Sequence, residues 1–144
     1  MNINNETSVS YEYICYCDGG SRGNPGIAGI GVVIYNTQTK KKIEIAKYLG
    51  NDKTNNFAEY TAMVICLEKL VEFKAKSALV IADSELIVKQ MNGEYSVKSP
   101  NIKPLYKKAR DFADQIETIK IKHTYRSGNS RADELANEAM DKKQ

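Results

Sequence analysis

Residues 13–35, YICYCDGGSRGNPGIAGIGVVIY, combine two runs of strand-forming residues with a glycine-rich segment. Their β-branched and aromatic residues predict one strand over residues 11–18 and a second over residues 28–36. The first strand ends on Asp18, and a glycine-rich loop containing the turn signal Gly23-Asn24-Pro25-Gly26 joins the two strands. Core packing explains neither that carboxylate nor those glycines, so the rest of the chain has to account for both.

The elements after residue 36 alternate between strand and helix patterns. NNFAEYTAMVICLEKLVEFK, from residue 55, leaves little polar face and predicts a largely buried helix, and the apolar SALVIA before Asp83 is typical of a parallel strand. The remaining predicted elements are a third strand at about 42–50, a short helix at about 85–91, a helix with Pro104 near its first turn, a strand TIKIKHTY and a closing helix. The order βββαβααβα predicts an α/β protein with a five-stranded mixed sheet flanked by helices.

Length and composition indicate one domain. The chain has 144 residues, of which 42% are hydrophobic and 27% charged, and we expect a domain at 11–140 between a disordered tail at 1–10 and a short tail at 141–144. The formal charge of +3 permits nucleic-acid binding without arguing for it. The three cysteines are expected to be buried thiols without disulfide bonds, which indicates a reducing compartment. Since there is no membrane-length apolar run and no leader pattern, we expect a cytoplasmic location, with the nucleoid or, in a eukaryote, the nucleus as the alternative. We also expect a monomer.

The predicted order brings four carboxylates to one edge of the sheet. Asp18 ends the first strand at the edge where the central helix begins, and that helix carries Glu59 near its start. The parallel strand before Asp83 ends at the same edge, and the closing helix begins there with Asp133 in its first turn. The carboxyl ends of parallel strands form ligand sites in open α/β sheets. Crowded carboxylates repel unless a cation lies among them, and all-oxygen ligands suit Mg²⁺ or Mn²⁺.

Each carboxylate taken singly has a simpler interpretation. Glu59 lies three residues after Asn56 and Asp133 lies three after Ser130, so either could be the acid of a capping box. The two aspartates at strand ends could be turn residues. Convergence of all four favours a metal site, and that convergence depends on the predicted strand order.

Four motifs occur along the chain: DGGSRGNPG, TNNFAEY, IADSELIVKQMNGEY and RSGNSRADELAN. With them the chain, from about Tyr13 to Met140, resembles a type 1 ribonuclease H of the short archaeal-like form, an enzyme that cuts the RNA strand of RNA/DNA hybrids. The resemblance implies that the residues holding two Mg²⁺ ions, for which Mn²⁺ can substitute, are Asp18, Glu59, Asp83 and Asp133. The implied reaction is hydrolysis of an RNA phosphodiester to a 5′-phosphate and a 3′-hydroxyl, a chemistry that paired metals can perform without a covalent nucleophile.

The resemblance also implies which residues bind the hybrid: Gly19, Gly23, Asn24, Thr54, Asn55 and Asn56. The glycines would let the backbone approach a sugar-phosphate strand. Asn24 would lie at the RNA strand near the 2′-hydroxyls, the other two asparagines near base edges and backbone, and Thr54 near a phosphate of the DNA strand. Such contacts read shape and sugar identity more than base sequence.

Two residues compete for a helper role near the last motif. Family members commonly carry a mobile histidine ten residues before the last aspartate, and His123 has this spacing from Asp133. His123 also falls inside the alternating strand TIKIKHTY, where a structural histidine is equally expected. Shorter members use an arginine seven residues before that aspartate, which here is Arg126. We favour Arg126, whose guanidinium can contact the scissile phosphate but cannot act as a base near neutral pH.

The chain departs from the family pattern in two places. It has no tryptophan and no basic protrusion between the third and last motifs, so added grip there would come from Lys89, Lys98, Lys103, Lys107 and Lys108. Glu85 stands where a glutamine often follows the serine, which leaves open whether this position contacts nucleic acid or tunes metal binding.

A binding module is the main alternative to an enzyme. Such a domain would grip a hybrid or double-stranded RNA without cutting, and the loss of one carboxylate would signal it, yet all four are present. An early Asp-x-Glu pair would indicate a 3′ to 5′ exonuclease, but Gly-Gly follows Asp18. The sequence leaves open whether RNA/RNA duplexes are also cut.

Overall fold

The computed structural model describes residues 10–144. A five-stranded sheet of order β3-β2-β1-β4-β5 forms the centre, with β1, β4 and β5 parallel and β2 and β3 antiparallel to their neighbours. The elements are β1 (Tyr13–Gly23), β2 (Gly26–Asn36), β3 (Lys42–Lys53), α2 (Asn55–Glu72), β4 (Ser77–Ala82), α3 (Glu85–Met91), α4 (Lys103–Ala113), β5 (Thr118–His123), the 3₁₀ helix η1 (Arg126–Asn129) and α5 (Ser130–Lys142). The predicted mixed sheet and the order of its elements are confirmed. The predicted tail at 1–10 lies, except for Ser10, outside the described residues.

The glycine-rich stretch is strand rather than loop, which corrects the sequence prediction. β1 continues through Asp18 to Gly23 and pairs with β2 along its whole length, so that only Asn24 and Pro25 form the turn. Glycine has a low strand propensity, but backbone pairing with β2 keeps the ladder intact here. β3 likewise extends to Lys53, beyond the predicted end at residue 50, and its register with β2 shifts near Ala28.

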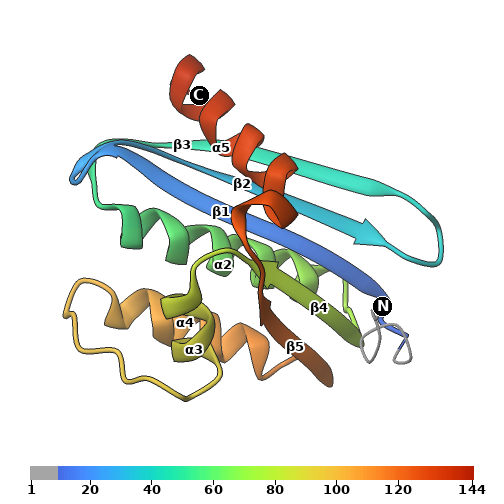
Figure 1. Ribbon diagram of the computed structural model, residues 1–144. Coiled ribbons are helices and arrows are strands. Elements are labelled where there is room, and N and C mark those ends of the chain that lie inside the picture. The colour runs from blue at the N-terminus through green and yellow to red at the C-terminus, as the bar shows by residue number, and fades with distance from the viewer. Residues whose placement is uncertain (1–9) are drawn as a thin grey trace.

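Helices cover both faces of the sheet (Figure 1). α2 packs on one face, with α3 and α4 beyond it, and α5 lies on the opposite face across β2 (Figure 1). The α2 side chains Tyr60, Met63, Leu67 and Leu70 are almost fully buried, as the sequence predicts for a central helix. The buried hydroxyl of Tyr60 donates to Gln90 Oε1 at 2.6 Å and ties α2 to α3.

The helix ends differ in detail from the sequence prediction. Thr54, not Asn56, is the N-cap of α2, and its hydroxyl accepts a hydrogen bond from the Phe57 N–H at 3.1 Å. α3 begins after Ser84, whose hydroxyl accepts from the Ile87 N–H. α5 continues to Lys142, beyond the boundary expected at residue 140.

The three cysteines are free and buried, as predicted for packed thiols. Cys15 and Cys17 lie on β1 and Cys66 on α2, all facing the core between sheet and helix. Burial raises the pKa of the Cys17 thiol well above its ordinary value, with nearby acidic groups adding to the shift. This side chain therefore stays a neutral thiol, even though it borders the carboxylates.

Within residues 10–144, no helix combines the length and the apolar character that a membrane span requires.

Two glycines let the helices approach the sheet at the level of Asp18. A Cβ on Gly19 would overlap the carbonyl group of Ala58 in α2, and a Cβ on Gly31 would overlap the carbonyl oxygen of Ala132 in α5. Gly31 is paired with Asp18 across β1 and β2, so both point to the face on which α5 lies. Gly19 and Gly31 thus allow close packing of helix backbone on strand backbone.

We expect Gly31→Ala to lower the free energy of unfolding by about 1–3 kcal/mol, because the new methyl group forces α5 away from β2. Urea denaturation followed by circular dichroism measures the change. Gly20→Ala is the matched control, since its Cβ would meet nothing closer than Asn55 Oδ1 at 3.6 Å. Equal stability of the two variants would contradict this account of the packing.

Candidate active site

Asp18 and Asp83 are neighbours at the point where β4 ends and β1 continues. The last residue pair of the parallel β1–β4 ladder is Cys17 with Ala82, and an aspartate follows each of these two residues. β1 runs on as a ribbon with β2, whereas β4 ends and Asp83 leads into the N-cap Ser84. Asp18 is therefore inside a strand, which excludes the turn role for it, whereas Asp83 lies in a bend between the end of β4 and a helix N-cap.

Glu59 reaches the same edge from α2. The close contact of Ala58 with Gly19 places the start of this helix directly against β1. Ligand oxygens of Asp18, Glu59 and Asp83 lie within 4.8 Å of one another, and among the described residues they form the only such acidic group that could hold a metal ion. Glu59 is five residues after the true N-cap, Thr54, so the capping-box interpretation of this side chain is wrong.

Asp133 approaches Asp18 from the opposite face of the sheet. It lies in the first turn of α5, and its carboxyl group is close enough to that of Asp18 to raise the pKa of Asp18. The N-cap of α5 is Asn129, whose side chain makes no capping bond, and Ser130 is already helical, so the capping box predicted for Asp133 is absent. Three carboxylates thus form one group, and the fourth contacts it through Asp18.

Burial and mutual repulsion shift the titration of this cluster. Burial, followed by the charge of Asp83 and the contact with Asp133, raises the pKa of Asp18 to about 8. Burial and the Asp83 charge raise the pKa of Glu59 to about 7, although a hydrogen bond with Ser84 and the positive charge of Arg126 act in the opposite direction. Without a cation, Asp18 and Glu59 would therefore keep their protons at pH values at which carboxyl groups are ordinarily ionised.

A small hollow opens among these side chains. Its lining combines acidic and apolar groups: Cys17, Asp18, Glu59, Met63, Ala82, Asp83, Ser84 and Ile87. Asp83 Oδ2 is buried there without a hydrogen-bond partner, which is costly for a carboxylate oxygen. An unpartnered oxygen, raised acid pKa values and an all-oxygen donor set fit a hard divalent cation such as Mg²⁺ or Mn²⁺.

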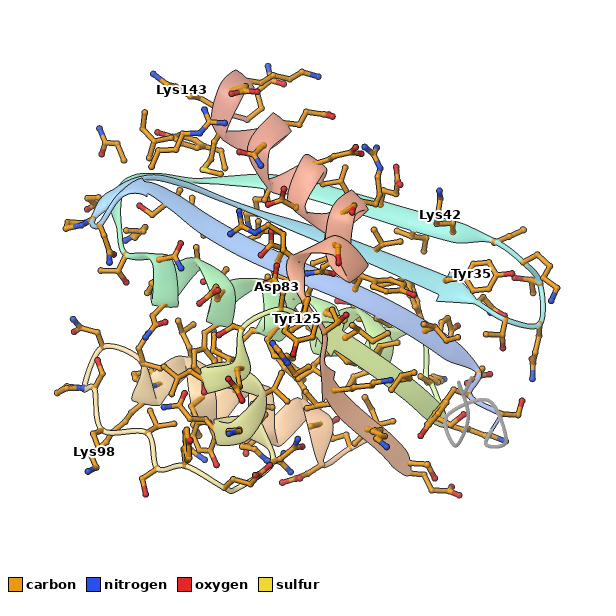
Figure 2. All side chains as sticks on the ribbon, viewed as in Figure 1. Tyr35, Lys42, Asp83, Lys98, Tyr125 and Lys143 are labelled. Carbon is orange, nitrogen blue, oxygen red and sulfur yellow. The ribbon has the colours of Figure 1, made fainter. Side chains whose placement is uncertain are left out.

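The two helper candidates lie at different places. His123 is the last residue of β5, half-buried, and its ring meets that of Tyr125 edge-on with centroids 5.6 Å apart. Arg126 is exposed in η1 and is close enough to Glu59 to affect its pKa. Figure 2 labels Asp83 at the end of β4 and Tyr125 on the segment that leads from β5 to α5.

Glu85 lies outside the acidic group. Its carboxylate forms an ion pair with Lys89 at 3.1 Å, one turn along α3, and Lys89 also lies over the ring of Tyr95. Of the five lysines considered for substrate grip, Lys89 is thus held by neighbours and Lys107 pairs with Asp111. The other three, Lys98, Lys103 and Lys108, are exposed.

A polar groove lies beside the acidic group and gathers most of the predicted substrate-binding residues. It is lined by Asn24, Thr54, Asn55, Asn56, Ser99, Asn101 and Ile102. Asn24 Oδ1 accepts from the Asn55 N–H at 3.0 Å, and Asn55 Oδ1 accepts from the Ser21 N–H at 3.2 Å. These bonds hold the β1–β2 turn against the start of α2 and direct each amide oxygen inward.

The remaining predicted positions differ from this group. Gly23, the last residue of β1, has a φ of 103°, and the start of α2 fills the space that a side chain on Gly19 would occupy. Sequence reasoning missed Ser99 and Asn101, which lie in an irregular connection with no catalytic pattern, and it missed Ser84 and the buried Asn129. A serine shortly before the apolar residues of α3 is an N-cap signal that could have identified Ser84.

Known proteins resemble this chain in sequence over most of its length. A family model described as reverse transcriptase-like matches residues 16–139. The bifunctional protein Rv2228c of Mycobacterium tuberculosis is 41% identical over 124 residues, which are 86% of this chain and 34% of that protein. Ribonuclease HI of Halobacterium salinarum is 36% identical over 126 residues, 88% of this chain and 63% of that one. The chain therefore spans about a third of the first relative and less than two thirds of the second.

Solved structures share the fold closely. The N-terminal RNase H domain of Rv2228c has a TM-score of 0.86 at 40% identity, covering 92% of this chain and 96% of that one. RNase H1 of H. salinarum has a TM-score of 0.83 at 35% identity, covering 90% and 98%. LC11-RNase H1, solved in complex with an RNA/DNA hybrid, has a TM-score of 0.82 at 44% identity, covering 91% and 98%.

The raised acid pKa values predict how stability depends on pH when no metal is bound. An acid whose pKa is higher in the folded state stabilises the fold below its unfolded value, 3.8 for Asp18 and 4.5 for Glu59. That contribution is lost as the pH rises through the folded values of about 8 and about 7. We therefore expect the free energy of unfolding in EDTA to fall between about pH 5 and about pH 9.

Urea denaturation in EDTA across this range measures the effect. Asp18→Asn should flatten the fall, while Asp111→Asn, which alters an exposed carboxylate of α4 outside the acidic group, should retain it. Constant or rising wild-type stability over the range would contradict the pKa assignment.

Proposed function

Because this chain belongs to the ribonuclease H family, we propose that it is an endonuclease that hydrolyses the RNA strand of RNA/DNA hybrids. The observation that carries the proposal is the acidic cluster, in which three carboxylates lie within 4.8 Å and a fourth contacts Asp18. A fold likeness by itself leaves catalysis open, whereas all four acids at one edge of the sheet favour an enzyme over a binding module.

The cluster suggests how its residues divide between two Mg²⁺ ions, for which Mn²⁺ can substitute. Asp18 is shared, since it lies in the group with Glu59 and Asp83 and also contacts Asp133. We assign one ion to the group of three and the other to Asp18 with Asp133. When bound, the pair supplies Lewis acidity and lowers the pKa of water, as hydrolysis to a 5′-phosphate and a 3′-hydroxyl requires.

The chain's own residues prepare this chemistry. Two close backbone contacts, at Gly19 and Gly31, hold the acids from α2 and α5 against β1, so little reorganisation is needed. The Ser84 hydroxyl, which accepts from the Ile87 N–H, lies close enough to Glu59 to oppose the rise in its pKa. The apolar walls Met63 and Ile87 limit access of water from the core side. We assign Arg126 to the scissile phosphate, because its charge reaches Glu59 from an exposed position.

The groove beside the cluster suits the minor groove of a hybrid. Each amide oxygen of Asn24 and Asn55 is occupied by a backbone donor, so the NH₂ half is available for 2′-hydroxyls, base edges or phosphates. Thr54, with Ser99 and Asn101 from the α3–α4 connection, adds polar groups next to a phosphate of the DNA strand. Such donors recognise shape and sugar rather than base sequence.

The decisive test is cleavage of an end-labelled RNA/DNA hybrid in millimolar Mg²⁺. We expect internal cuts in the RNA strand only, with loss of activity in EDTA. Asp18→Asn should reduce the rate by about a thousandfold or more, since metal ions contribute several kcal/mol to such reactions. Asp111→Asn should cleave as the wild type does. Binding of the hybrid without cleavage in Mg²⁺ or Mn²⁺ would favour the non-catalytic module. The same assay with an RNA/RNA duplex tests whether double-stranded RNA is also cut.

The helper assignment makes a separate prediction. Arg126→Ala should lower kcat by about tenfold or more, because a cation that stabilises transition-state charge is lost, and Arg126→Lys should recover part of the rate. His123→Ala should leave kcat near the wild-type value. Single-turnover cleavage at saturating enzyme separates this effect from substrate binding. A larger loss in the histidine variant would reverse the assignment.

A further inference from the structure

Three consecutive residues at the start of α5 contact three different strands. Arg131 forms a two-pronged ion pair with Glu44 of β3, at 2.7 Å from Nε and 2.9 Å from an Nη. Ala132 lies on Gly31 of β2 with no room for another carbon. Asp133 contacts Asp18 of β1. The first turn of this helix therefore bridges the three strands that lie beneath it.

The ion pair and the catalytic contact lie on opposite sides of the helix. Successive residues of an α-helix are about 100° apart, so Arg131 and Asp133 project about 200° apart around the axis. Ala132, between them, rests on the sheet and acts as a pivot. Any rotation of α5 about its axis that loosened the Arg131 contact would also move Asp133 relative to Asp18.

The pair joins the helix start to β3, while other contacts fix the entry segment and the far end of the helix. Asn129 donates to the Cys17 carbonyl at 2.9 Å and fixes the segment that enters α5 near β1. At the far end, Arg22 pairs with Asp141 at 2.7 Å and donates to Asn137 Oδ1 at 3.1 Å. Neither set of contacts holds the first turn of α5 on its β3 side.

Glu44 is placed for this contact by the sheet. It is paired with Val33, two residues beyond Gly31 on β2, so its side chain projects to the face that carries α5. Its carboxylate is about a quarter exposed, with Lys42 at 3.5 Å and the Arg131 fork on its two oxygens. A bidentate arginine pair fixes direction as well as distance, which a single charge contact does not.

We propose that the Glu44–Arg131 pair is a remote positioning device, which sets the rotation of α5 and thereby holds Asp133 in place to complete the metal site. The proposal rests on the metal-dependent function proposed above. Neither residue touches the reacting groups. Their effect is on the affinity of the site for metal and on the metal concentration at which the enzyme works.

The chain supplies a closely matched control in Glu134. Arg131 also pairs with Glu134 at 2.9 Å, so Glu134→Gln removes one carboxylate from the same arginine but leaves the bridge to β3. Glu44→Gln removes the same charge and breaks the bridge. Because Glu134 is the immediate neighbour of Asp133, a general electrostatic effect would be at least as large in the control variant.

The experiment measures Mn²⁺ binding by calorimetry without substrate, and the Mg²⁺ dependence of hybrid cleavage. We expect Glu44→Gln and Arg131→Gln each to weaken Mn²⁺ binding by about two- to fivefold, the range of a well-formed exposed ion pair. The double variant should be no weaker than either single one, since both break the same contact. Thermal unfolding of each variant verifies that it is folded.

The outcomes separate the two proposals. Wild-type protein that binds no Mn²⁺ and cuts no hybrid would overturn the proposed function itself. Wild-type metal binding with Glu44→Gln equal to Glu134→Gln would overturn the positioning role alone. Additive losses in the double variant would also overturn it, because independent effects of two charges would then account for the data.

Discussion

Two glycines let helix backbone pack directly on strand backbone, and the positions of the acids carried by α2 and α5 follow from these two contacts. At Gly19 the start of α2 lies directly on β1, and at Gly31 the start of α5 lies directly on β2. The two contacts are on opposite faces of the sheet, because Gly31 is paired directly with Asp18 and Gly19 is the next residue of β1. Acids carried by two helices can therefore meet a third acid inside a strand, at distances that intervening side chains would not permit.

This closeness works against the stability of the metal-free protein. Buried carboxylates that repel one another shift their pKa values upward, as Asp18 and Glu59 do, and Asp83 leaves an oxygen unpartnered. A region that violates the ordinary rules of packing and charge is typical of a functional site, and the fold elsewhere supplies the compensating energy. Here the compensation is the apolar core between β1, β4 and α2. A bound divalent cation would remove most of the conflict, because it replaces repulsion with ligation.

The proposed catalytic acids and the proposed substrate groove belong to different parts of the molecule. The acids come from rigid strands and helix starts, whereas the groove beside them combines the β1–β2 turn, the entry to α2 and the α3–α4 connection. Amide and hydroxyl groups line that groove, and the lysines near it are exposed or already paired. A surface of this composition favours recognition of the shape and sugars of a duplex over a strong, sequence-independent electrostatic grip.

Much of this protein follows from sequence alone, because local patterns determine it. The 2-residue and 3.6-residue periods establish the order of strands and helices, and that order by itself brings Asp18, Glu59, Asp83 and Asp133 to one edge. Tertiary structure decided what depends on contacts between distant segments. Those contacts keep the glycines after Asp18 in a strand, make Thr54 rather than Asn56 the cap of α2, bring Ser99 and Asn101 to the groove, and connect Arg131 to Glu44 across 87 positions of sequence. Local propensity is a weak preference that backbone pairing and close packing override, and no pattern along the chain records which distant residue fills the space that a glycine leaves.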